Sequence, residues 1–280
     1  MLLTRILTAL VLAPLVVAAL FGLPPAGWAL VALGFVTAAA WEWAALARAR
    51  LPARAAYAAA TALLGLALLF APAARFGVAG WPAWVAVPLL VAATAFWVLL
   101  LPFWLRGRWR LPGGAPAWLL GWLLLLATWV ALVQLQARSP WVVLAAMALV
   151  WIADTAAYFV GRAFGRRKLA PQISPGKSWE GVYGGLVAVG AYAAWLLSLA
   201  RNRGEVGALT AAELALWIAV ALALALLSVG GDLFESLLKR HAGVKDSGRI
   251  LPGHGGVLDR IDALLAAMPA AALAAAVLLG

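Results

Sequence analysis

The sequence predicts an all-α integral membrane protein with about nine transmembrane helices. Of its 280 residues, 66% are hydrophobic and only 11% are charged, whereas soluble proteins carry roughly 25% charged residues. Mean hydropathy is +1.01. Long apolar runs such as residues 117–136 lack the apolar–polar alternation of barrel strands, so we expect helices, each needing about 20 residues to cross a bilayer.

The chain divides into apolar runs separated by loops rich in Pro, Gly and basic residues. Each run is long enough for one crossing. The predicted spans lie near residues 6–22, 26–47, 55–71, 82–104, 116–136, 140–161, 179–199, 211–235 and 261–279.

Basic residues predict the orientation of these spans. All but four of the 21 Lys and Arg residues fall at loops on one face, the four being Arg75, Arg138, Arg201 and Arg203. The positive-inside rule assigns the rich face to the cytoplasm, with the N-terminus inside and the C-terminus outside. The net charge of +11 is therefore interpreted as a topology signal of an inner-membrane protein, and no nucleic-acid partner is expected. A cleaved signal peptide at the N-terminus remains an alternative.

Acidic residues divide the single membrane domain, residues 1–280, into two parts. Nine of the ten lie from Asp154 onward, so residues 1–139 are predicted to be a helical scaffold and residues 140–280 to carry the chemistry. Glu42, the exception, could line the site, but pairing with Arg48 or another loop arginine is the favoured interpretation. Cys is absent and His occurs twice, which favours a metal bound by oxygen, such as Mg²⁺.

The first polar segment, residues 154–162, ends the sixth span. Asp154 and Tyr158 are four residues apart and share a helix face, which Arg162 extends toward the cytoplasm. A carboxylate inside a span indicates a functional site. An internal Asp–Arg pair is the structural alternative.

The second segment, residues 168–181, reads KLAPQISPGKSWEG. Residues 174–178 are predicted to form a turn that gathers hydroxyl groups and Lys177 before a helix. Ser178 could cap that helix, whose free N–H groups would suit a phosphate; an ordinary turn with a helix cap is the alternative. Gly181 and Gly185, four residues apart, favour close helix packing.

The third segment runs from Gly230 to Asp262. Asp232 and Glu235 lie about one turn apart near the end of the eighth span, and Asp259 and Asp262 share a face at the start of the ninth. The antiparallel return is expected to bring Asp232 beside Asp259, and their repulsion would be relieved by a shared cation. Alternatively, the later aspartates interact with a helix N-terminus and nearby arginines.

The loop between these helices holds five of the 21 basic residues and both histidines. His254 precedes Gly255 and Gly256, which would let backbone approach a ligand closely. His254 is interpreted as a ligand contact or proton shuttle, with a turn-stabilising hydrogen bond as the alternative. His241 is expected to be solvated.

Residues 236–262, SLLKRHAGVKDSGRILPGHGGVLDRID, resemble the signature of the phosphatidate cytidylyltransferase (CDP-diacylglycerol synthase) family. Residues 154–162 and 174–181 are similar to further motifs of that family. Gly176 and Ser178 stand where many members have Lys and Thr. The resemblance covers the C-terminal half well, and the first five spans only in general character.

The resemblance implies an enzyme that transfers a cytidylyl group from CTP to phosphatidate, giving CDP-diacylglycerol and pyrophosphate at the cytoplasmic face. It implies a requirement for Mg²⁺, held by Asp232 and Asp259, and a second cation such as K⁺ could accompany it. The expected partners are CTP, phosphatidate and the bilayer, and a homodimer stays open. The implied catalytic residues are Asp232, Asp259, Lys239, Arg240 and Lys245, and the implied substrate-binding residues are Asp154, Tyr158, Arg162, Ser174, Lys177, Ser178, Glu180, Ser236, Asp246, His254, Gly255, Gly256, Arg260 and Asp262.

Two other functions use similar residues. A secondary transporter for an anionic solute would use Asp154 and Asp232 for coupling ions, with broken helices in both halves. A CTP-dependent lipid kinase would apply the phosphate- and metal-binding groups to a lipid alcohol.

Overall fold

The computed structural model describes residues 2–70, 80–204, 207 and 209–278, with side chains from residue 10 onward. Arg75 and the side chain of Arg5, both used to predict orientation, lie outside this described part. The elements are α1 (Leu2–Gly22), α2 (Pro25–Leu46), α3 (Leu51–Leu69), α4 (Ala83–Ala95), the π-helical η1 (Phe96–Leu100), α5 (Leu101–Gly107), α6 (Ala115–Arg138), α7 (Pro140–Phe164), β1 (Lys168–Ala170), β2 (Ser174–Ser178), α8 (Trp179–Asn202), α9 (Ala211–Ala242) and α10 (Leu258–Leu278).

Eight helical segments in the described residues are long and apolar enough to cross a membrane. They coincide with predicted spans two to nine, and α4, η1 and α5 together form one of them, Ala83–Gly107. The first predicted span falls on α1, whose described apolar part, Leu10–Gly22, is shorter than a full crossing. The all-helical membrane architecture is therefore confirmed.

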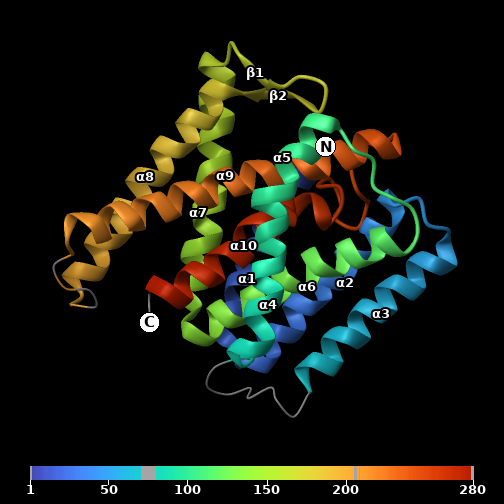
Figure 1. Cartoon of the computed structure of the whole chain (residues 1–280), viewed down its shortest axis with the longest axis horizontal. Helices are drawn as coiled ribbons and strands as arrows, with labels where there is room; N and C mark the ends of the chain where they lie inside the picture. Colours follow the sequence, from blue (N-terminus) through green and yellow to red (C-terminus); the bar gives the residue numbers. More distant parts are fainter. Residues whose placement is uncertain (1, 71–79, 205–206, 208, 279–280) are drawn as a thin grey trace.

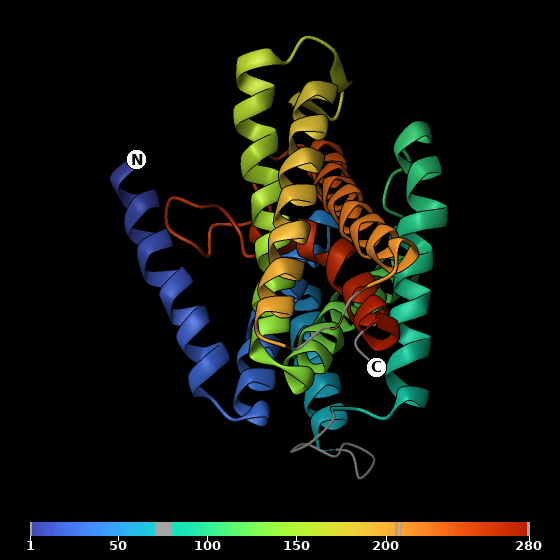
Figure 2. The same ribbon diagram turned by 90° about the vertical axis from the view of Figure 1, so that its left-hand side faces the viewer.

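Helix α10 lies at the centre of the bundle. It packs against α2, α4, α6, α7 and α9, and most of its side chains from Ala263 to Ala272 are buried. Helices α7 and α8 form an adjacent antiparallel pair joined through the β1–β2 hairpin (Figure 1). Figure 2 shows α1 at one edge, leaning away from the other helices toward the end marked N. Helix α10, which carries Asp259 in its first turn, is thus surrounded by both halves of the chain.

The segment predicted as a turn, residues 174–178, is instead strand β2. It pairs antiparallel with β1, and Lys168 lies opposite Ser178. Two local causes explain this: Pro175 disfavours the helical region for Ser174, and the reversal occurs earlier, where the Ile173 N–H donates to the Ala170 carbonyl. Ile173 is buried against Leu233 and Leu237 of α9, so the hairpin is fixed over the end of that helix.

Glycines allow close contacts between helices that carry polar residues. A Cβ at Gly181 or Gly185 of α8 would lie 2.7 or 2.9 Å from a carbonyl oxygen of α7, which confirms the predicted close packing. A Cβ at Gly231 would clash with the carbonyl oxygen of Asp262. Helix α9 runs unbroken through Gly230 and Gly231. These glycines therefore let neighbours approach and do not open the helix.

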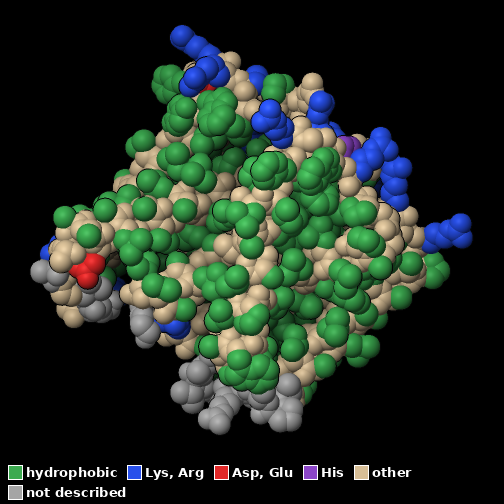
Figure 3. Space-filling view, in the orientation of Figure 1, with side chains coloured by type: hydrophobic (Ala, Val, Ile, Leu, Met, Phe, Trp, Pro, Cys, Tyr) green, Lys and Arg blue, Asp and Glu red, His purple; other side chains and the backbone are tan. Residues whose placement is uncertain are grey.

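Lys and Arg side chains gather at one end of the molecule. In Figure 3 most of the visible ones follow the upper and right-hand edges, over the β1–β2 hairpin, the end of α5 and the start of α3, and smaller groups lie at the left and lower left. The broad remaining surface in this view is mostly hydrophobic, which suits contact with lipid. Glu235 of α9 is buried in the interior, and Asp259 of α10 is half-buried.

Replacement of Gly231 by Ala is expected to push α9 away from α10 and to lower Tm, because overpacking a close contact costs about 1–3 kcal/mol. The matched control is Gly190→Ala in α8, where an added Cβ meets nothing within 4 Å and Ala is the better helix former. Thermal unfolding in detergent measures both. Equal Tm values for the two variants would contradict the role given to Gly231.

Candidate active site

The start of α10 is held by a carboxylate from the other half of the chain. Glu42 of α2 is fully buried and accepts hydrogen bonds from the backbone N–H groups of Val257 (3.1 Å) and Leu258 (2.8 Å). It also accepts one from the Ser247 hydroxyl (3.1 Å). The residue before the helix is Val257, which has no side-chain acceptor, so Glu42 takes the part of a helix cap. A negative charge is favourable at this position.

This arrangement corrects the predicted pairing of Glu42 with Arg48 or another loop arginine. Arg48 donates to the carbonyl oxygen of His241 at 2.6 Å. Glu42 lies on the face of α2 turned toward α10, where unsatisfied N–H groups offer better partners than a flexible loop cation. His241 belongs to α9, and its Nδ1 is buried without a hydrogen-bond partner among the described residues, so it is not the solvated loop residue we expected.

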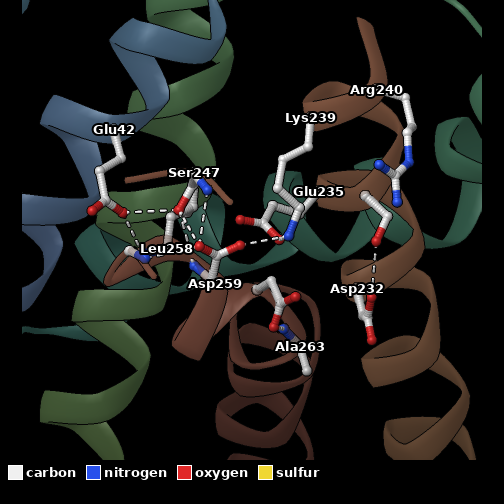
Figure 4. Close-up of polar contacts among 12 residues, drawn as sticks. Glu42, Asp232, Glu235, Lys239, Arg240, Ser247, Leu258, Asp259 and Ala263 are labelled. Carbon is white, nitrogen blue, oxygen red and sulfur yellow. Dashed lines mark hydrogen bonds and ion pairs between the residues drawn. The ribbon is translucent and has the colours of Figure 1, made fainter. Parts of the chain in front are cut away.

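Asp259 is fixed on both sides of its carboxylate (Figure 4). One oxygen accepts from the backbone N–H groups of Ser247 and Gly256, each at 2.8 Å, and from the Ser247 hydroxyl at 3.0 Å. The other oxygen pairs with Lys239 of α9 at 2.5 Å. The aspartate side chain is therefore locked toward α9 before any ligand binds.

Lys239 also pairs with Glu235, one turn earlier in α9, at 2.5 Å. Both side chains are largely withdrawn from solvent, with 13% and 3% exposed. The second carboxylate oxygen of Glu235 is buried and has no hydrogen-bond partner among the described residues. An unsatisfied buried carboxylate oxygen is costly, and it marks a place where a cation would be favourable.

Asp232 belongs to a second group next to the first. It pairs with Lys177 of β2 at 2.7 Å and accepts a hydrogen bond from Ser236 at 3.2 Å. Asp154 of α7 lies within electrostatic range of both Asp232 and Lys177. Residues from α7, β2 and α9 therefore meet here, as the three polar segments of the sequence predicted.

Asp262 connects the two groups. It accepts from the N–H of Ala263 at 2.7 Å, and it lies within electrostatic range of Asp154, Asp232 and Lys239. Asp232 and Asp259 lie in the same region, between α9 and the start of α10 (Figure 4), but each pairs with its own lysine. The carboxylate cluster consists of Asp154, Asp232, Glu235, Asp259 and Asp262.

Five carboxylates against two lysines leave an excess of negative charge away from bulk water, which favours a bound cation. Their oxygens are the ligands that Mg²⁺ prefers. Within the described residues, no three acidic or histidine side chains stand close enough together to hold a metal ion. A cation here would therefore need oxygen atoms from a ligand or from water to complete its shell.

Several predicted substrate-binding residues have structural partners. Ser178 caps α8 by accepting from the Gly181 N–H at 3.2 Å and is buried, which confirms the helix-cap interpretation. Glu180 accepts from the N–H groups of Arg166 and Arg167. Tyr183 and Glu180 raise the pKa of the Arg167 guanidinium, so this loop cation keeps its charge. These residues fix the junction of α7, β1 and α8.

Other predicted residues have partners outside the carboxylate cluster. Arg240 is exposed and donates to the Ile173 carbonyl at 3.3 Å, tying α9 to the hairpin. Arg162 donates to the Tyr158 hydroxyl at 3.2 Å, and within the described residues no hydrogen bond or ion pair joins this exposed pair to the cluster. Ser174 is half-buried in β2.

The loop before α10 separates its polar side chains. Lys245, Asp246 and Arg260 are exposed, whereas Ser247 points inward. Arg260 and His254 line a cavity on the side of α10 turned away from Lys239.

The glycines of the same loop have a clear steric role. Gly255 has a positive φ of 83°, and a Cβ there would lie 2.8 Å from the Asp259 carboxylate. A Cβ at Gly256 would clash with Ser247 and Glu42. Close approach of the backbone to these two carboxylates therefore requires glycine at both positions.

Three residues of this site were not among the predicted site residues: Glu42, Glu235 and Ser247. Glu42 carried a signal, because it is the one acidic residue before Asp154 and a charge within a span usually has a function. Glu235 was visible as a helical neighbour of Asp232 and Lys239. Ser247 had no distinctive signal, because its role depends on a loop conformation.

The sequence model of the Cytidylyltransferase family matches residues 3–278. This match covers nearly the whole chain, including Glu42 and all five residues of the carboxylate cluster. The chain belongs to this family. It is also similar to a protein of Pseudomonas aeruginosa named phosphatidate cytidylyltransferase, with 45% identity over 96% of this chain and 95% of the relative.

Shorter matches link the chain to proteins of other bacteria. Proteins with the same name from Haemophilus influenzae and Thermotoga maritima are 52% and 46% identical. These matches cover 43% and 42% of this chain, and 41% and 43% of the relatives. The family is therefore shown by the matches that cover nearly the whole chain.

Replacement of Glu42 by Gln is expected to lower the free energy of unfolding by about 2 kcal/mol, because hydrogen bonds to a charged group are lost and an amide N–H₂ meets backbone donors. The control is Glu213→Gln, which changes an exposed acidic residue in the capping box of α9. Thermal unfolding in detergent compares them. A larger loss of Tm for the Glu213 variant would contradict the importance given to Glu42.

Proposed function

We propose that the chain transfers a cytidylyl group from CTP to phosphatidate, forming CDP-diacylglycerol and pyrophosphate. The observation that carries the proposal is the carboxylate cluster with Lys177 and Lys239, built from α7, β2, α9 and α10 in a member of the Cytidylyltransferase family. Relatives named phosphatidate cytidylyltransferase support the choice of substrates.

Asp232 and Asp259 are the proposed holders of Mg²⁺, and Glu235 and Asp262 would add negative charge nearby. When bound, Mg²⁺ would offset the charge of the triphosphate and of the departing pyrophosphate. Mg²⁺ is commonly held by one or two carboxylates together with substrate phosphates and water, which suits a cluster that lacks a complete set of ligands among its described residues. A second cation such as K⁺ would find further carboxylates there.

The basic residues have a positioning role in this proposal. The lipid phosphate oxygen attacks the α-phosphorus of CTP in line, a new P–O bond forms, and the bond to the β-phosphate oxygen breaks. Lys177 and Lys239 are held beside the carboxylates, and Arg240 near the end of α9 and Lys245 in the loop that follows are exposed. They would bring the two anionic substrates together and stabilise charge on the pyrophosphate.

No side-chain nucleophile is needed, because the lipid phosphate already carries the attacking oxygen. Asp259 is held by backbone N–H groups and Lys239, so it is already oriented when CTP arrives. Such preorganisation avoids the cost of rearrangement during the reaction.

We place the site at the cytoplasmic face of the inner membrane. The basic edge seen in Figure 3 supports this orientation through the positive-inside rule, and the matched relatives are bacterial. CTP would then enter from the cytoplasm, and phosphatidate from the bilayer.

The two alternative functions receive less support. A transporter would use broken helices at corresponding positions of two halves, whereas α9 is continuous beside Asp232 and the carboxylate cluster draws only on the second half. A lipid kinase would transfer the terminal phosphate of CTP and release CDP. The names of the relatives favour cytidylyl transfer.

Purified protein with CTP, phosphatidate and Mg²⁺ is expected to form CDP-diacylglycerol, and Asp232→Asn or Asp259→Asn should lower kcat by at least about 100-fold through lost charge stabilisation. Arg201→Ala, at the opposite end of α8, is the control and should keep activity. Chromatography of labelled lipid separates the products. Phosphorylated lipid with CDP would indicate a kinase, and full activity of both aspartate variants would remove their proposed roles.

Removal of divalent cations by EDTA is expected to abolish product formation, and added Mg²⁺ should restore it. Independently of turnover, Mg²⁺ with CTP should raise the Tm of the wild-type protein, because a ligand that binds the folded state stabilises it. The Asp259→Asn variant should need a higher Mg²⁺ concentration for the same rise. Identical Mg²⁺ dependence of Tm in both proteins would contradict the assignment of Asp259.

A further inference from the structure

A cavity lies on the other side of α10 from the carboxylate cluster. Its volume is about 330 Å³, and it is bordered by α1, α2, α6, α7, α10 and the loop before α10. The lining is almost wholly apolar, with Trp28, Phe35 and Trp151 among the largest side chains. Lining residues of α2 run from Trp28 to Val36, so the cavity follows that helix for about 12 Å. An elongated apolar slot of this kind suits a hydrocarbon chain.

The polar groups of the cavity come from one region. His254 and Arg260, from the loop and first turn of α10, are its ionisable lining residues, and no Asp or Glu lines it within the described part of the chain. The guanidinium of Arg260 is exposed and has no hydrogen bond or ion pair among the described residues. The Nδ1 of His254 is buried and lacks a hydrogen-bond partner there. Both groups match a phosphate attached to an apolar chain.

The first turns of α10 have two different faces. Asp259 and Asp262 face Lys239 and the carboxylate cluster. Val257, Arg260, Ile261 and Leu264, at spacings of three and four residues, face the cavity. The same short segment therefore borders both the proposed nucleotide site and the apolar cavity, which lie on opposite sides of its backbone.

Helix α1 provides the outer wall. Ala13 and Val16 line the cavity, and Figure 2 shows α1 at the edge of the molecule, leaning outward at the end where the loop before α10 lies. Ala13 itself is exposed. A lipid in the bilayer could thus reach the cavity from the side without passing through water.

We propose that this cavity binds an acyl chain of phosphatidate, with Arg260 and His254 at its mouth binding the lipid phosphate. The proposal rests on the proposed function for the choice of phosphatidate. It assigns the two substrates to opposite faces of the start of α10: CTP beside Asp259, and the lipid beside Arg260. The lipid phosphate would then lie at the N-terminal end of α10, where the loop that borders the cavity also binds Asp259, while the lipid tails remain in an apolar environment.

The test uses Ala13→Trp, which fills the cavity from the edge helix without disturbing the buried core, and Ala18→Trp as a matched control. Ala18 is an exposed alanine of the same helix outside the cavity lining. Binding of dioleoyl and dihexanoyl phosphatidate to detergent-purified protein is followed by native mass spectrometry. Ala13→Trp is expected to weaken dioleoyl phosphatidate about tenfold, equal to about 1.4 kcal/mol, and to leave the dihexanoyl lipid unchanged.

A second variant tests the mouth of the cavity. Arg260→Gln should weaken both phosphatidates, because they share the phosphate, whereas Arg201→Gln should weaken neither. Dioleoyl phosphatidylglycerol is the competitor, since its phosphate is a diester with less charge. Equal binding by the Ala13 and Ala18 variants, or equal competition by phosphatidylglycerol, would overturn the proposal.

The enzyme assay separates this proposal from the proposed function. If wild-type protein forms no CDP-diacylglycerol but Ala13→Trp selectively loses dioleoyl phosphatidate, the function fails and the lipid site stands. If wild-type protein is active and the Ala13→Trp and Ala18→Trp variants have the same KM for the dioleoyl substrate, the proposed function stands and the lipid site fails.

Discussion

The start of α10 leaves backbone N–H groups that must be satisfied inside a membrane protein, and the sequence provides no capping side chain immediately before it. Glu42 meets this need from α2, more than 200 positions away in the sequence (215 and 216 residues for its two backbone partners). Because Ser247 binds both Glu42 and Asp259, the same contact also fixes the loop and the first aspartate of the helix. The position of the carboxylate cluster depends on this junction.

Close packing of α9 against α10 brings further charged residues to this junction. Gly231 lets α9 approach the backbone of α10, so Asp232, Glu235 and Lys239 meet Asp259 and Asp262. The resulting cluster has more acids than bases, and a bound cation would offset part of that charge. A site built mainly from carboxylates can therefore still bind an anionic substrate. The acids attract a metal ion, and the lysines and the metal ion together attract phosphate. The apolar cavity on the other face of α10 adds a place for the tails of a lipid.

Prediction from the sequence succeeded where local pattern is enough. The apolar runs located spans two to nine, and the spacing of Gly181 and Gly185 indicated the close contact of α7 and α8. Ser178 was recognised as a candidate helix cap. The turn predicted at residues 174–178 was wrong, because the reversal falls at residues 171–173 and the burial of Ile173 against α9 favours an extended strand. Glu42 was assigned to a loop arginine, because nothing in its neighbourhood reveals the helix end that it faces.

The sequence by itself determined the membrane class, the helical spans, the family resemblance and the segments that carry charge. These properties depend on hydropathy, helical spacing and residue order, all of which are local. Only the tertiary structure decided that Asp232 pairs with Lys177 and Asp259 with Lys239, that Asp262 joins the two groups, and that Arg260 turns toward an apolar cavity. The reason is physical: ion pairs and cavities depend on which helix faces meet, and that is set by packing between residues far apart in the chain.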